Sequence, residues 1–199
     1  MFDFKHKGCN IDISNLCTLE CLRCMRIDWK DKKQIPGKIM TVEQFRKIVN
    51  YFRYIHFCGS ISDPIFNPYL TTFLSMCKNA NKGSTVHTAA SQKPISWYED
   101  AFDINPDTNW IFGLDGLPEE SCMYRINQDG EKLFEVMKMG AKKGLKIDWQ
   151  YIVFSYNEEH IEEAQQMAKD NGLNFVIVHS GRWYGEDDAY RPRTPEFST

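Results

Sequence analysis

The chain has 199 residues, 42% of them hydrophobic, which is enough apolar material for one domain with a single core. The net charge of −3 excludes a protein that binds nucleic acid through a global excess of basic residues. No apolar run is long enough to predict a membrane span, and the start of the chain lacks the apolar stretch of a secretory signal. We therefore expect a cytoplasmic protein whose seven cysteines stay reduced, since an odd number suits a disulfide framework poorly.

The first predicted strand, Cys9–Ser14, is followed by three closely spaced cysteines, Cys17, Cys21 and Cys24. Their pattern is C-x3-C-x2-C, with no fourth cysteine nearby. Thiolates favour zinc and iron–sulfur clusters, and a structural zinc site has four protein ligands. Three thiolates on a four-iron cube leave one iron open. The missing fourth cysteine therefore predicts an open metal position at which substrate chemistry occurs.

A zinc site with a remote fourth ligand is the competing interpretation of the same spacing. Asp28, His6 and Cys9 are the nearest candidates for that ligand. Such a site would serve structure or sensing, and spacing alone does not separate it from a cluster.

Short β-rich runs alternate with helical patterns along the rest of the chain. Thr41 begins a capping box, and it opens a helix with apolar residues at Phe45, Ile48, Val49 and Phe52. Five further strands are predicted, at Tyr54–Cys58, Thr85–Ala90, Asn109–Leu114, Lys146–Phe154 and Asn174–His179.

Four more helices are expected between these strands. Asn67 is predicted to cap a helix that ends at Gly83, and Ser96 to begin a second capping box. The pattern predicts a helix over Lys132–Lys143, and Asn157 is expected to cap the last helix.

Alternating strands and helices predict a parallel sheet with helices on its outside. Six strands are too few for a full eight-unit barrel, so we expect a partial (β/α)6 TIM-type barrel, open at one side. Ligands of such folds bind at the carboxyl ends of the strands, which is where the three cysteines lie. We expect this domain to span residues 1–181, and residues 182–199 to form an extended or poorly ordered tail.

The cysteine motif after the first strand resembles that of radical S-adenosylmethionine (SAM) enzymes. The resemblance implies a 4Fe-4S cluster held by Cys17, Cys21 and Cys24, with S-adenosylmethionine on the open iron. Reductive cleavage of the sulfonium would release a 5′-deoxyadenosyl radical that abstracts a hydrogen atom from substrate. One departure is visible: Arg23 stands where the family usually has an aromatic residue that contacts the adenine.

The segment after the second strand resembles the glycine-rich loop that binds the amino group of S-adenosylmethionine in this family. Gly59 suits a close backbone approach, and Asp63 stands where the family usually has glutamate. Ser62 replaces the second glycine. An ordinary Asp-Pro turn is the alternative interpretation of Asp63.

The ends of the third and fourth strands supply further residues implied by the resemblance. Thr88 or Ser91 would contact S-adenosylmethionine. Asp115 and Arg125 match the aspartate and arginine of the peptide-modifying branch, the one with SPASM or twitch extensions, and Arg125 would pair with the carboxylate of S-adenosylmethionine. Gly113 replaces a serine that often binds S-adenosylmethionine, and a solvated surface arginine is the alternative for Arg125.

The fifth strand would back the adenine, which makes Val153 and Asn157 expected neighbours of S-adenosylmethionine. A helix cap is the alternative role of Asn157. A histidine, an arginine and a tryptophan after the sixth strand, at His179, Arg182 and Trp183, would line the substrate or adenine site.

The resemblance implies a minimal radical SAM enzyme that acts on a bulky peptide-like or protein substrate. No cysteine follows Cys122, so either the auxiliary-cluster extension of many peptide-modifying relatives is absent or the sequence is a fragment of a longer chain. An external flavodoxin or ferredoxin would supply the electron. The alternatives are a glycyl-radical activating enzyme, a deazapurine-forming relative, a non-catalytic zinc or Fe–S module, and a scaffold that binds no S-adenosylmethionine.

Overall fold

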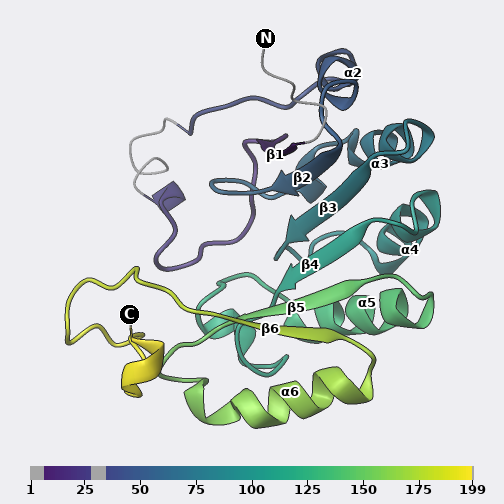
Figure 1. Ribbon diagram of the computed structural model, residues 1–199. Coiled ribbons are helices and arrows are strands. Elements are labelled where there is room, and N and C mark those ends of the chain that lie inside the picture. The colour runs from purple at the N-terminus through teal and green to yellow at the C-terminus, as the bar shows by residue number, and fades with distance from the viewer. Residues whose placement is uncertain (1–6, 28–34, 199) are drawn as a thin grey trace.

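A single parallel sheet runs through the computed structural model, which describes residues 7–27 and 35–198 (Figure 1). Its six strands lie in chain order, β1-β2-β3-β4-β5-β6, and each neighbouring pair is parallel. The strands are β1 (Gly8–Asp12), β2 (Tyr54–Cys58), β3 (Gly83–Thr88), β4 (Asn109–Gly113), β5 (Ile147–Ile152) and β6 (Asn174–Val178). All six strands predicted from the sequence are present, and the predicted partial barrel is confirmed.

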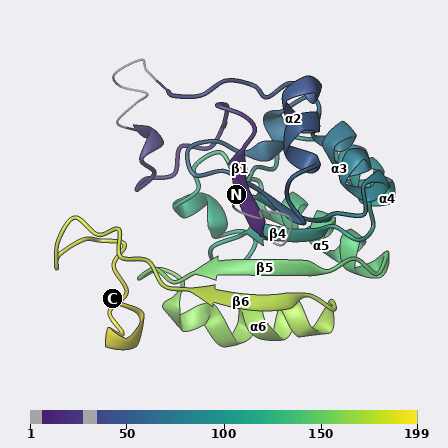
Figure 2. The ribbon, with the colours of Figure 1, turned by 45° about the horizontal axis from the view of Figure 1, so that its top comes forward.

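In the part of the chain that the structure describes, each of the first five strands is connected to the next through a helix of at least eight residues. These are α2 (Val42–Val49), α3 (Leu70–Asn79), α4 (Ile95–Ile104), α5 (Gly130–Lys142) and α6 (Ile161–Asp170). Helices α2 to α5 lie together on one side of the sheet, and α6 runs along β6 (Figures 1 and 2). Short 3-10 turns lie in the connections at η2 (Pro64–Phe66), η3 (Ser121–Met123) and η4 (Glu158–His160), and η5 (Pro195–Phe197) lies after the last strand.

Aromatic side chains fill the layer between sheet and helices. Phe45 of α2 stacks on Phe73 of α3 with 4.3 Å between ring centroids, and both rings lie near Phe57 of β2. Farther along the sheet, Trp110 and Phe112 of β4 are fully buried. Side chains of a strand alternate between the two faces of the sheet, so Ile111, which lies between Trp110 and Phe112, is on the face without helices.

The face without helices is more polar than the core. The strand register places residues of this face side by side: His56 of β2 lies beside Thr85 of β3, and His87 of β3 lies beside Ile111 of β4. A closed barrel of this type is normally filled with branched apolar side chains. Polar residues here agree with a face that is open.

The capping box at the start of α2 is confirmed, because Thr41 and Gln44 exchange side-chain-to-backbone hydrogen bonds of 3.3 and 2.9 Å. Two other predicted helix starts were wrong. Asn67 does not cap α3, since its side chain donates to the carbonyls of Ile13 and Met40 and accepts from Tyr69 N. Ser96 lies inside α4, whose N-cap is Pro94.

Several predicted boundaries were also shifted. Gly83 begins β3 and does not end α3, which stops at Asn79. Helix α5 begins at Gly130, two residues before the predicted start, because Asp129 caps it by accepting from Lys132 N. Asn157 precedes η4 without a side-chain capping bond.

The C-terminal segment, residues 182–198, crosses the carboxyl ends of the last strands and contains only the short turn η5 (Figure 1). The Glu158 carboxylate accepts from the backbone N–H groups of Arg193 and Thr194. Ser155 N donates to Tyr190 O at 3.1 Å. The domain boundary at residue 181 stays a prediction.

None of the helices in the described part of the chain is long and apolar enough to cross a membrane.

Replacing Phe73 with alanine should lower the free energy of unfolding by about 3–5 kcal/mol, because it opens a cavity between two buried rings. Urea denaturation of the variant measures this loss. Thr72→Ala is the matched control, since Thr72 is exposed on the same helix. Equal midpoints for the two variants would contradict the packing described.

Candidate functional site

The loop that follows β1, here called the thiol loop (residues 13–27), lies at the carboxyl ends of the strands (Figures 1 and 2). It is fastened to the segment after η3 by backbone hydrogen bonds, Glu20 N to Ile126 O at 3.1 Å and Leu22 N to Tyr124 O at 3.4 Å. The loop is therefore braced by a segment about a hundred positions away in sequence.

Cys17, Cys21 and Cys24 all line two adjoining cavities of about 360 and 160 Å³. Among the described residues, no three Cys, His, Asp or Glu side chains are arranged to hold a single metal ion. The larger cavity lies within the thiol loop. The smaller one extends from the thiols to the ends of β2, β3 and β5.

Two of these thiols lie in an environment that favours the protonated form. Burial, followed by the negative charge of Asp63, raises the pKa of Cys17 to about 12. Burial also raises the pKa of Cys21, and the positive charge of Arg125 opposes that shift. A metal group that binds the thiolates must therefore displace protons from them.

The turn after β2 is closed by its own backbone. A Cβ atom at Gly59 would collide with the Ser62 carbonyl, so the turn requires glycine there. Asp12, at the end of β1, accepts from Ser60 N at 3.0 Å and from the Ser62 hydroxyl at 3.2 Å. Gly59, Ser62 and Asp63 all line the smaller cavity.

The Asp63 carboxylate is buried and accepts hydrogen bonds from four groups. Thr88 Oγ1 donates at 2.8 Å, the backbone N–H groups of Ala89 and Ala90 donate at 2.9 and 3.0 Å, and Ile65 N donates at 3.2 Å. Burial raises the pKa of Asp63, and these donors oppose that shift. The carboxylate therefore holds the end of β3 against the turn after β2, and its contact with a ligand ammonium group stays a prediction.

The two hydroxyl residues at the end of β3 differ in position. Thr88 lines the smaller cavity, although its hydroxyl donates to Asp63. Ser91 is buried and does not line the cavity, and its hydroxyl accepts a hydrogen bond from Asp129 N at 2.8 Å. Ser91 thus anchors the start of α5.

Asp115 and Arg125 form a buried ion pair, with Arg125 Nε 2.7 Å from Asp115 Oδ2. The other carboxylate oxygen accepts from Ile152 N at 2.9 Å. Burial raises the pKa of Asp115, and the Arg125 guanidinium opposes that shift. Arg125 lines the smaller cavity, whereas Asp115 lies behind it as its partner.

Gly113 is explained by the position of Arg125. A Cβ atom at Gly113 would come within 2.8 Å of Arg125 Nη2 and 3.1 Å of its Cζ. The serine that the family often has here and this placement of Arg125 cannot coexist without movement.

Val153 and Asn157 lie outside the residues that line the smaller cavity, whereas Ile152 lines it. Asn157 is buried; its side chain accepts from Phe154 N at 2.7 Å and donates to Ile152 O at 3.0 Å. It closes the turn after β5. Its contact with S-adenosylmethionine stays a prediction.

Arg26 and His87, which the sequence did not single out, also line this cavity, and so does Arg182, which was expected to line the substrate or adenine site. Arg26 donates to the carbonyls of Asn15 and Ile61, and so joins the thiol loop to the turn after β2. His87 comes from the open face of the sheet, and Arg182 from the C-terminal segment. The only signal for Arg26 was its place two positions after Cys24.

The imidazole of His87 forms no hydrogen bond to a described residue, and it lines the cavity. Burial, together with the positive charge of Arg125, lowers the pKa of His87 to about 4. The ring is therefore neutral at physiological pH, with one donor and one acceptor to offer a ligand.

No protein-family model matches the chain, and no curated protein matches it in sequence. Solved structures match it in fold. SuiB from Streptococcus suis has a TM-score of 0.70 at 14% identity, over 98% of this chain and 42% of SuiB. The protein anSMEcpe, solved with bound AdoMet, has a TM-score of 0.67 at 15% identity, over 93% of this chain and 54% of its own. Methylornithine synthase (PylB) has a TM-score of 0.64 at 10% identity, over 88% of this chain and 53% of PylB.

These three proteins are radical SAM enzymes, and the chain shares their fold. It spans only about half of their length. SuiB has also been solved with its precursor peptide SuiA, and anSMEcpe with AdoMet and a peptide. The predicted resemblance is confirmed at the level of the fold.

Replacing Asp63 with alanine should lower the free energy of unfolding by about 3 kcal/mol, because four buried donors lose their acceptor. Thr88→Val removes only one of these bonds and should cost about 1 kcal/mol. Urea denaturation without added ligand measures both losses. An Asp63→Ala variant with an unchanged free energy of unfolding would contradict the bracing role of the carboxylate.

The stability of the chain should fall in mild acid partly because of His87. Its pKa in the folded state is lowered, so the unfolded chain binds the proton first as the pH falls from about 6.5 to about 4. This one group should cost up to about 1.4 kcal/mol per pH unit in that window, and nothing above it. Comparing urea denaturation of the chain and His87→Gln at pH 7, 6 and 5 isolates this contribution. Parallel losses in both proteins would contradict it.

Proposed function

We propose that the chain is a radical SAM enzyme in which Cys17, Cys21 and Cys24 hold a 4Fe-4S cluster. The observation that carries the proposal is that three thiols, a tight glycine turn and a buried Asp–Arg pair meet around one cavity. That cavity lies at the carboxyl ends of a sheet with the fold of these enzymes, the edge at which such sheets bind ligands.

The residues present fit both groups. Thiolates are the ligands that iron–sulfur clusters use, and three of them leave one metal position for another ligand. Backbone carbonyls in the turn after β2 suit an ammonium group, and a guanidinium suits a carboxylate. When bound, the cluster and S-adenosylmethionine supply a 5′-deoxyadenosyl radical, which abstracts a hydrogen atom from the substrate.

The chain's own residues prepare the site. Gly59 and Asp63 shape the turn that would receive the amino group, and Thr88 supports it from β3. Arg125, whose Nε is occupied by Asp115, keeps its terminal nitrogens for the carboxylate of S-adenosylmethionine. Ser91 and Asn157 hold the surrounding connections, and Val153 lies behind them.

For the substrate we propose a peptide or another bulky molecule. The support is the polar side chains on the face of the sheet without helices, among them His56 of β2 and His87 of β3, and the peptides bound by SuiB and anSMEcpe. We further propose a flavodoxin or ferredoxin as electron donor, in the cytoplasm, where the thiols stay reduced.

The sequence leaves four other functions open. A glycyl-radical activating enzyme and a deazapurine-forming relative would share the three-thiol loop, but the Asp115–Arg125 pair favours the peptide-modifying branch. A zinc module would contain stoichiometric zinc without iron. A scaffold would bind no S-adenosylmethionine.

Anaerobic reconstitution with iron and sulfide, followed by S-adenosylmethionine and dithionite, should yield 5′-deoxyadenosine. Cys17→Ala, Cys21→Ala and Cys24→Ala should each abolish the product and lower bound iron, because each removes a cluster ligand. Cys122→Ser is the matched control, since Cys122 is exposed and lies outside both cavities. Iron analysis and chromatography measure the two quantities.

An intact cluster that yields no 5′-deoxyadenosine would contradict the proposal. One equivalent of zinc and no iron after anaerobic purification would favour the zinc module instead.

A further inference from the structure

Arg23, which replaces the usual aromatic residue of the thiol loop, is paired with the C-terminal segment. Its guanidinium donates to Asp188 through Nε, at 3.1 Å from Oδ2, and through Nη2, at 2.9 Å from each carboxylate oxygen. The same guanidinium lies 4.1 Å from the centre of the Tyr184 ring and 5.4 Å from that of Tyr190. One side chain of the thiol loop thus contacts three residues of the C-terminal segment.

Asp188 organises the segment from within. Its carboxylate also accepts from Tyr184 N at 2.8 Å and from Tyr190 N at 3.0 Å, and the side chain is fully buried. These bonds make residues 184–190 a closed turn around one carboxylate. A bidentate arginine pair with a buried partner is among the stronger ion pairs in proteins.

Aromatic packing ties the other side of this turn to the site. Tyr190 packs against Tyr124 and Phe154, with ring centroids 6.0 and 6.3 Å apart, and Trp183 packs edge-on against Phe154 at 5.9 Å. Tyr124 precedes Arg125 and itself lines the smaller cavity. The turn is therefore clamped between the thiol loop and the Arg125 segment.

The clamp places two donor groups beside Cys24. Arg182 lines the smaller cavity and also a neighbouring pocket of about 300 Å³, which it shares with Arg23, Cys24, Met25, Trp183 and Tyr184. The Arg182 guanidinium forms no hydrogen bond to a described residue. Trp183 Nε1 is a buried donor without an acceptor in the described part of the chain. A buried N–H without a partner is costly, so it points to an acceptor that a ligand supplies.

We propose that Arg23 is a positioning residue that acts through Asp188 to hold Arg182 and Trp183 beside Cys24, where the two side chains donate to acceptor atoms of bound S-adenosylmethionine. The inference rests on the proposed function, and it makes the C-terminal segment part of the ligand site. The aromatic contact of the relatives is replaced by a salt bridge that recruits aromatic residues from elsewhere in the chain.

The test is a double-mutant cycle with Arg23→Gln and Asp188→Asn, read in two ways. The first reading is the rate of chymotrypsin cleavage after Tyr184 and Tyr190 in the protein without S-adenosylmethionine. The second is the dissociation constant of S-adenosylmethionine for the anaerobically reconstituted protein, by equilibrium dialysis. Each single variant should raise both quantities about tenfold, and the double variant should raise them no further, because both remove the same interaction.

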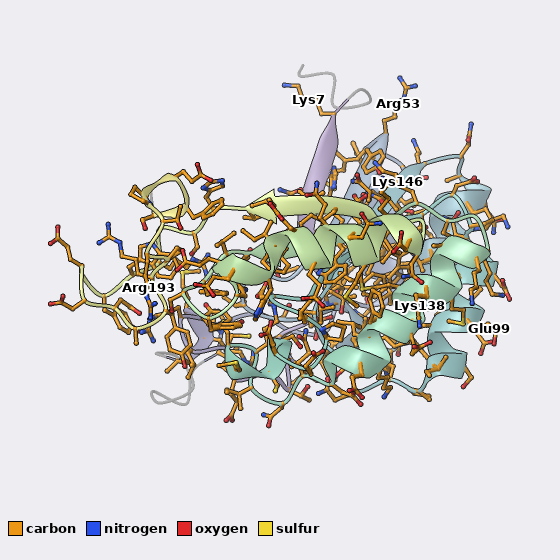
Figure 3. All side chains as sticks on the ribbon, turned by 90° about the horizontal axis from the view of Figure 1, so that it is seen from below. Lys7, Arg53, Glu99, Lys138, Lys146 and Arg193 are labelled. Atoms are coloured by element: carbon orange, nitrogen blue, oxygen red, sulfur yellow. The ribbon has the colours of Figure 1, made fainter. Side chains whose placement is uncertain are left out.

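Two further variants separate positioning from binding. Trp183→Phe keeps the ring against Phe154 but removes the donor, so it should raise the dissociation constant about fivefold and leave cleavage unchanged. Lys138→Gln is the control for loss of a surface ion pair, since Lys138 pairs with Glu135 on α5, on the opposite side of the molecule from Arg193 of the C-terminal segment (Figure 3). It should change neither quantity.

Faster cleavage with an unchanged dissociation constant would overturn the positioning role, and so would additive effects in the cycle. If the reconstituted parent protein binds no S-adenosylmethionine, the proposed function fails and takes this inference with it. Failure of the inference alone leaves binding by the parent intact, so the two failures are distinguishable.

Discussion

Asp63 is the residue on which the arrangement of the site depends. Its backbone N–H donates to Leu16 O of the thiol loop at 2.9 Å, while its carboxylate accepts from Thr88, Ala89 and Ala90 at the end of β3. One buried residue therefore joins the carboxyl ends of the first three strands. A buried carboxylate is tolerated only when donors surround it, so the same bonds that offset its desolvation also fix the loops.

Arginines make the longer-range connections in the same region. Arg26 bridges two loops through backbone carbonyls, Arg125 pairs with Asp115, and Arg23 pairs with Asp188. Each arginine joins residues that lie ten or more positions apart in the sequence. Guanidinium groups suit this task because they carry several donors in a fixed plane and keep their charge when buried.

Local sequence patterns were sufficient to predict the sheet and its helices. The capping box at Thr41 and the apolar period of α3 are determined within a few residues of each other, so they can be seen without the fold. Asn67 shows where this fails: besides its local bond from Tyr69 N, its side chain donates to the carbonyls of Ile13 and Met40, which are distant in sequence. The prediction at Ser96 was wrong by two residues, because α4 already begins at Ile95, directly after Pro94.

The candidate site was only partly predictable for the same reason. The cysteines form a local motif, and the loop residues Gly59 and Asp63 follow a strand end. The ion pair between Arg23 and Asp188 joins segments more than 150 positions apart, and no sequence spacing encodes such a contact. Likewise, glycine at position 113 is explained only once the Arg125 side chain is in place.

The backbone bonds between the thiol loop and the Arg125 segment have a thermodynamic consequence. Glu20 and Leu22 of the loop donate to carbonyls on either side of Arg125, so the position of the thiol loop and the position of Arg125 depend on each other. A group that orders the loop by binding the thiols lowers the cost of ordering the arginine, and the reverse holds for a group that binds the arginine. Linkage requires that each raise the affinity of the other by the same factor.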